Sequence, residues 1–150
     1  KKTALWLTSI FLFAFVTNSY QSITKLYGIR NNGLGYKNRS FQESRLFKFI
    51  EKSNRRIYTN FPKKLYINAP DKDILELPIK YKSTTTESNS KYGKSLESVI
   101  NQVKENKAYI VLLPSESRGF ATGISDIPNK DPEIEIISLP NGHIIKSTNH

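Results

Sequence analysis

LESVINQV at residues 96–103 and AYIVLL at residues 108–113 are the two stretches that decide the fold. In the first, the apolar residues Leu96, Val99, Ile100 and Val103 recur at the spacing i, i+3, i+4, i+7, which is typical of an amphipathic helix with Ser95 as its cap. The second is a continuous apolar run that ends at Pro114 and is typical of a strand buried on both faces. A helix leading into such a strand predicts an α/β fold in which 108–113 is the central strand of a parallel or mixed sheet.

The stretch before this pair supplies further elements. The pattern S-x-x-E at Ser40–Glu43 is a capping box, which predicts an amphipathic helix over about 41–53. Residues 56–59 are rich in strand-forming residues and predict a first strand. Asn60 is expected to cap a short helix that has Pro62 in its first turn. Residues 75–79 are extended but contain Pro78, which favours an edge of the sheet.

The last part of the chain predicts a β-hairpin. Residues 133–138 alternate in polarity, Asn141-Gly142 predicts a tight turn, and residues 143–146 predict the returning strand. The complete order α-β-α-β-α-β-β predicts a small α/β domain of three or two layers. Its sheet is mixed, helices flank it, and the hairpin lies at its C-terminal end.

The chain opens with an apolar run, residues 4–16, that contains no charge. A helix that spans a bilayer needs about 20 apolar residues, whereas the core of a signal peptide has about 7–15. A membrane anchor, a signal peptide and a buried helix are therefore all open. The anchor is favoured because Val16–Ser19 lacks a small-x-small cleavage pattern and the run has no polar face. We expect a transmembrane (or signal) segment at 1–24, a connector at 25–39 and a soluble α/β domain at 40–150.

Composition limits the chemistry. The 150 residues include 23 Lys and Arg against 13 Asp and Glu, giving a net charge of +10. The chain has no cysteine, which excludes disulfides, thiolate metal sites and cysteine nucleophiles. Such a charge suits an anionic partner, and the absence of a nucleic-acid-binding motif favours a membrane surface over nucleic acid. The positive-inside rule favours Lys1-Lys2 in the cytoplasm and the domain outside it, whereas Lys25 and Arg30 on the other side of the segment oppose this orientation.

Several segments together resemble one family. A membrane helix is followed by NGLGYKN at 32–38, SRL at 44–46, RIYTN at 56–60, LYI at 65–67 and Leu77-Pro78. This succession resembles the extramembrane C-terminal tail of polytopic C-type membrane glycosyltransferases, the relatives of dolichyl-phosphate-mannose and aminoarabinose transferases. The resemblance implies a parent enzyme that moves a sugar from a polyprenyl-phosphate carrier to an acceptor outside the cytoplasm. It also implies that the catalytic acids lie upstream of Lys1, so it assigns no catalytic residue, metal or cofactor to this chain.

Two places are candidate binding sites. Tyr58, Thr59 and Asn60 lie where a predicted strand gives way to a helix, which is where ligands bind in α/β sheets. A sugar or phosphate contact competes there with a helix cap and a packed tyrosine. Arg118, after the central strand, could hold a phosphate, or the loop around it could be only surface. The alternative to the enzyme tail is an exported, non-enzymatic binding protein whose first residues are a signal peptide.

Overall fold

The structure is a computed structural model that describes residues 13–27, 39–81, 87–114, 121–128 and 131–149. The chain divides into two compact units, Lys1–Ser40 and Phe41–His150. In the first unit, residues 13–27 are helical. Among the described residues, no helix has both the length and the apolar character needed to cross a bilayer. The first twelve residues of the predicted segment 1–24 lie outside the described part of the chain.

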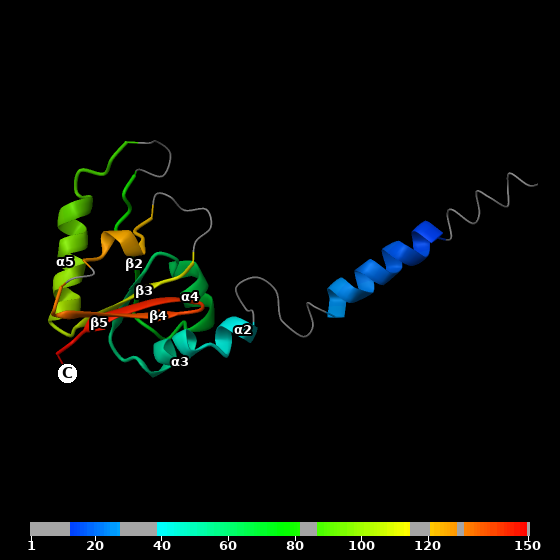
Figure 1. The fold of residues 1–150 in the computed structure, drawn as a ribbon, viewed down its shortest axis with the longest axis horizontal. Coiled ribbons are helices and arrows are strands. Elements are labelled where there is room, and N and C mark those ends of the chain that lie inside the picture. The colour runs from blue at the N-terminus through cyan, green and yellow to red at the C-terminus, as the bar shows by residue number, and fades with distance from the viewer. Residues whose placement is uncertain (1–12, 28–38, 82–86, 115–120, 129–130, 150) are drawn as a thin grey trace, which may run out of the picture. The chain divides into compact units, whose positions relative to one another are not determined.

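The second unit is built on a five-stranded mixed sheet (Figure 1). Its strands lie in the order β2-β1-β3-β5-β4. β1 pairs in parallel with β2 and with β3, whereas β5 pairs antiparallel with β3 and with β4. The bounds are β1 (Arg56–Thr59), β2 (Ile74–Glu76), β3 (Ala108–Leu112), β4 (Ile134–Leu139) and β5 (Gly142–Ser147). The predicted mixed sheet, its central strand and its C-terminal hairpin are therefore confirmed.

Helices cover both faces of this sheet. Their bounds are α2 (Arg39–Gln42), α3 (Arg45–Lys52), α4 (Pro62–Asn68) and α5 (Tyr92–Lys104). α2 and α3 precede β1, α4 connects β1 to β2, and α5 connects β2 to β3. The three-layer form of the prediction is thus the correct one.

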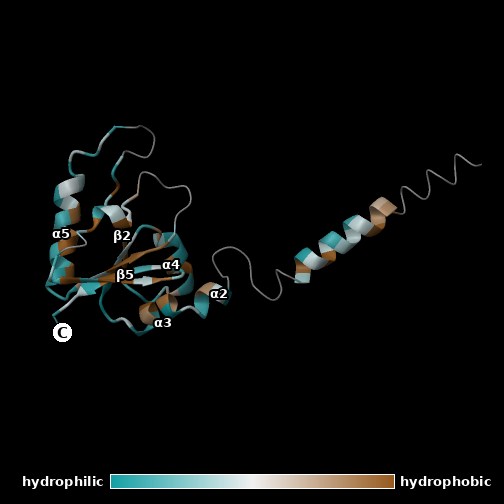
Figure 2. Ribbon diagram, viewed as in Figure 1, coloured by the Kyte–Doolittle hydropathy of each residue, from teal (hydrophilic) through white to brown (hydrophobic). Residues whose placement is uncertain are grey.

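Two hydrophobic cores hold the layers together, one on each face of the sheet. Successive residues of a strand point to opposite faces, so Ile57 of β1 belongs to the first core and Tyr58 to the second. The first core packs α2, α3 and α4 against the sheet through Phe41, Leu46, Phe47, Ile50, Leu65 and Ala69. The second packs α5 through Leu96, Val99 and Val103. Figure 2 shows that the sheet and the inner sides of these helices are predominantly apolar.

Three local predictions need correction. The predicted helix 41–53 is two helices, α2 and α3, and the cap is Ser44, whose Oγ accepts from the Phe47 N–H at 3.1 Å. Ser40 therefore does not cap a helix that begins at 41. α5 begins at Tyr92, so Ser95 lies inside its first turn. In the hairpin, Leu139 pairs with Gly142, which makes Pro140 and Asn141 the two turn residues.

Candidate functional site

The connections of the sheet define a point where its strand order reverses. From β1 the chain passes through α4 to β2 on one side, and then through α5 to β3 on the other side of β1. In open α/β sheets, ligands bind beside the carboxyl ends of the strands at such a point. Here these ends are Thr59–Asn60 of β1 and Leu112–Leu113 of β3.

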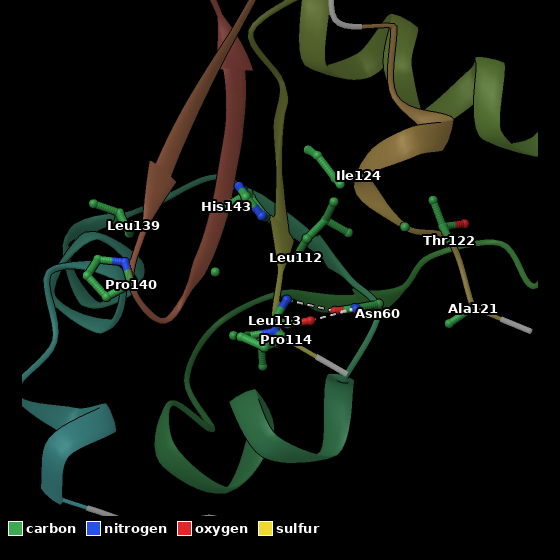
Figure 3. A pocket seen from close by; sticks show the side chains of 12 residues that line it. Asn60, Leu112, Leu113, Pro114, Ala121, Thr122, Ile124, Leu139, Pro140 and His143 are labelled. Carbon is green, nitrogen blue, oxygen red and sulfur yellow. Dashed lines mark hydrogen bonds between the residues drawn. The ribbon is translucent and has the colours of Figure 1, made fainter. Parts of the chain in front are cut away.

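A cavity of about 290 Å³ lies at this edge of the sheet (Figure 3). Its walls come from segments far apart in the sequence, because β5 runs antiparallel to β3 and so begins where β3 ends. The residues that line it include Asn60, Leu113, Pro114, Thr122, Pro140 and His143. The fold therefore produces one concave site from the ends of β1, β3 and β4 and the start of β5.

Asn60 is buried and lines this cavity, and both polar atoms of its side chain are hydrogen-bonded to the backbone of Leu113. Its Nδ2 donates to the Leu113 carbonyl and its Oδ1 accepts from the Leu113 N–H, both at 2.9 Å (Figure 3). The prediction that Asn60 caps α4 is wrong, because the N-cap position is Phe61 and no side chain caps this helix. Asn60 instead continues the pairing of β1 with β3 beyond the last ladder residue.

Thr59 and Tyr58 point to opposite faces of the sheet. Thr59 is fully buried on the α4 side, and its Oγ1 accepts from the Phe61 N–H at 3.2 Å. Tyr58 is buried on the α5 side, and its hydroxyl donates to Gln102 Oε1 at 3.2 Å. The three neighbours predicted as one contact surface are therefore separated: Tyr58 lines a groove, Thr59 lies in the core and Asn60 lines the cavity. Arg118, the fourth predicted site residue, lies outside the described residues.

The groove that Tyr58 helps to line has a volume of about 700 Å³ and runs along α5. Glu76 of β2 and two exposed lysines, Lys91 and Lys94, lie on its walls. The groove shares no lining residue with the cavity at the carboxyl ends of β1 and β3, so the two are separate.

One wall of the cavity is held by a polar network. Thr122 is buried and donates from Oγ1 to the Pro78 carbonyl at 2.6 Å, and it is hydrogen-bonded to the Tyr92 hydroxyl at 3.2 Å. Burial raises the pKa of the Tyr92 hydroxyl. Lys80 contacts Asp126 at 2.7 Å, and this hydrogen bond raises the pKa of the lysine. The network fixes the wall and leaves few of its polar groups free for a ligand.

His143 lines the cavity although it is not among the site residues predicted from the sequence. Its Nδ1 lies 3.0 Å from the Oγ of Ser138 on the neighbouring strand, because these two residues are paired across the hairpin. Within the described part of the chain, no carboxylate is hydrogen-bonded to this histidine, so the pair lacks the third member of a hydrolytic triad. Only the hairpin register places Ser138 beside His143, and the turn predicted at Asn141-Gly142 would have given a different register, with Pro140 opposite His143.

The described residues contain no group of three or more His, Asp or Glu side chains able to hold a metal ion. The cavity is lined by three polar side chains, those of Asn60, Thr122 and His143, among aliphatic residues, prolines and glycines. No protein-family model, no curated protein and no solved structure was found to match this chain. The family resemblance, and substrate contact by Tyr58, Thr59, Asn60 and Arg118, therefore stay predictions.

Proposed function

We propose that this chain is the extracytoplasmic accessory domain of a membrane glycosyltransferase-like protein that uses polyprenyl-phosphate sugars. The catalytic residues of that protein lie upstream of Lys1. The domain serves to position the carrier or the glycan acceptor at the membrane face, or to stabilise the parent protein. It acts without a cofactor and without nucleic acid.

The observation that carries this proposal is the division of the chain. An uncharged apolar run at 4–16 is followed by a unit, Phe41–His150, that has its own sheet and two cores. Because this unit has cores of its own, we expect it to fold without membrane-embedded contacts, and a tether to a bilayer would then serve location instead of folding.

The coding sequence on the 5′ side of the Lys1 codon tests the proposal. We expect an open frame that encodes several further apolar spans, with an acidic residue in the first outer loop. Deleting the codons for 41–150 from that frame should then lower sugar transfer in isolated membranes. A start codon directly before Lys1 would contradict the proposal.

The cavity at the carboxyl ends of β1 and β3 supports a second candidate, an exported binding protein without enzymatic activity. This candidate predicts a signal peptide and a mature N-terminus near Tyr20. Determining the N-terminal residue of the protein after secretion separates the two functions, because a retained apolar run agrees only with the tethered one.

A further inference from the structure

The positive charge of this chain is concentrated in one part of it. Residues 39–68 contain eight Lys and Arg but two Asp and Glu, and residues 1–38 contain five Lys and Arg and no acid. Residues 69–150 contain ten Lys and Arg and eleven Asp and Glu, so they are almost neutral. Because 39–68 includes α2, α3, β1 and α4, the surplus of the folded domain lies in the layer on one face of the sheet.

Three cations of this layer lie on the side of α3 that faces away from the core. On α3, Arg45, Lys48 and Lys52 are exposed at spacings of three and four residues, which places them along one side of the helix. The opposite side is buried through Leu46 and Ile50. None of the three cations forms an ion pair with a carboxylate of the described residues.

Cations elsewhere in the domain are mostly neutralised by acidic neighbours. Lys104 at the end of α5 contacts Asp131 at 2.6 Å and Glu133 at 3.3 Å. Lys146 on β5 contacts Glu135 at 3.0 Å. Lys91 and Lys94 of α5 are also exposed without an ion pair to the described residues, but α3 carries three such cations along one side of a single helix.

α4 adds exposed apolar groups to the same layer. Lys63, Tyr66 and Ile67 are at i, i+3 and i+4, so they share one side of this helix. The residue exposure of Tyr66 is 58% and that of Ile67 is 45%, whereas Leu65 alone is fully buried in the core. The neighbouring Lys64 packs its ammonium over the Phe41 ring at 4.4 Å, which joins α4 to α2.

From this arrangement we infer that the outer side of α2, α3 and α4 is a docking surface for an anionic phospholipid bilayer. Unpaired Lys and Arg side chains are attracted to acidic headgroups, and an amphipathic tyrosine with an adjacent isoleucine suits the boundary between headgroups and acyl chains. The chain supports this partner over others, since the basic layer, which begins at Arg39, is the first part of the folded domain after the apolar segment and a connector that contains no acidic residue. The inference rests on the proposed membrane tether and specifies the surface that meets the bilayer.

The lack of cysteine in the chain allows a site-specific test. In the full chain, Ile67→Cys carries an environment-sensitive fluorophore, and Ser98→Cys on the exposed side of α5 carries the same label as a control. Each protein is mixed with vesicles of phosphatidylcholine alone or of phosphatidylcholine with phosphatidylglycerol. We expect the label at 67 to shift to the blue only with the anionic vesicles, and the label at 98 not to respond.

Charge variants check the electrostatic part of the inference. Lys48→Gln with Lys52→Gln should weaken binding to the anionic vesicles by about fivefold for each charge removed. Lys91→Gln with Lys94→Gln removes two exposed lysines of the opposite layer and should leave binding unchanged. Circular dichroism confirms that both double variants keep the fold.

The outcomes distinguish a failure of the docking surface from a failure of the proposed membrane tether. If the chain floats with vesicles but the label at 67 stays silent, the tether stands and the docking surface is wrong. A response at 98, or equal loss in both double variants, also overturns the surface. If no vesicle retains the chain, tether and surface both fail. Tight binding of duplex DNA to the α3 surface, with no response to vesicles, would replace the bilayer with nucleic acid.

Discussion

The side chain of Asn60 is hydrogen-bonded through both of its polar atoms to the backbone N–H and C=O of Leu113, at 2.9 Å each. Asn60 follows β1 and Leu113 follows β3, so this pair closes the two central parallel strands at their carboxyl ends. A side-chain amide thus replaces a backbone pair at the point where the strands diverge around the cavity.

Replacing Asn60 should destabilise the domain. Asn60→Ala leaves two buried backbone groups of Leu113 without partners, each worth about 1–3 kcal/mol, so we expect a loss of at least about 2 kcal/mol. Asn60→Asp should cost more, because a carboxylate oxygen would face the Leu113 carbonyl. Urea unfolding followed by circular dichroism measures both. A loss below about 0.5 kcal/mol, within the range of ordinary surface substitutions, would show that the pair contributes little.

The sequence predicted the elements of the core more fully than those of the site. The helix at 96–103 is predicted by the spacing of its apolar residues, and the strand at 108–113 by its continuous apolar run. Both signals depend on local sequence alone. The parallel pairing of β1 with β3 joins residues more than fifty positions apart, and no local pattern encodes that register. The hydrogen-bond partner of Asn60 follows from this pairing. Its local context predicted a helix cap, but the backbone of Leu113 is the partner that the tertiary fold supplies.

The uneven distribution of positive charge along the chain can be read from the sequence, but only the fold shows which surface carries it. Residues 39–68 carry eight Lys and Arg against two Glu, yet only the packing of α3 and α4 on one face of the sheet brings this excess to one layer. The cavity depends even more on tertiary structure, since its walls come from β1, β3, β4, β5 and the segment 121–124.

Gly142 should tolerate no side chain. Its φ is +140°, and a Cβ at this position would lie 2.2 Å from the Leu112 carbonyl oxygen. We expect Gly142→Ala to lower the free energy of unfolding by about 2 kcal/mol or more, since it combines backbone strain with a steric clash. Gly93→Ala in α5 is the control, because a Cβ there meets no heavy atom within 4 Å. It should leave stability unchanged or raise it by up to about 1 kcal/mol. Equal effects at the two sites would contradict the described hairpin.

Truncating two adjacent residues of α4 should affect the free energy of unfolding very differently. Leu65 is fully buried, so Leu65→Ala should cost about 2–5 kcal/mol through lost contacts and a cavity. Tyr66 is exposed, so Tyr66→Ala should change stability by no more than about 0.5 kcal/mol. Thermal unfolding of the two variants checks this, and a larger loss for Tyr66 would mean that α4 is rotated about its axis.

Acidification should remove the contribution that Asp131 makes to the free energy of unfolding. The hydrogen bond from Lys104 lowers the pKa of this carboxyl below its ordinary value of 3.8. A depressed pKa stabilises the fold above the ordinary value, and that contribution is lost as the pH falls through the lowered pKa. Urea midpoints of the parent chain and of Asp131→Asn should therefore differ by a constant amount above about pH 4 and converge at lower pH. A difference that grows on acidification would show that the carboxyl is not ionised beside Lys104.

Membrane attachment through the N-terminal segment is the central claim, and flotation of the full chain on vesicles at high salt tests it most directly. High salt screens the basic layer, so what remains is attachment through the apolar run. We predict that the parent chain rises with the vesicles in 1 M salt, whereas a variant with Phe11→Asp and Leu12→Asp stays at the bottom of the gradient. If the parent chain also stays at the bottom, or if the variant floats equally well, residues 4–16 are not a membrane tether.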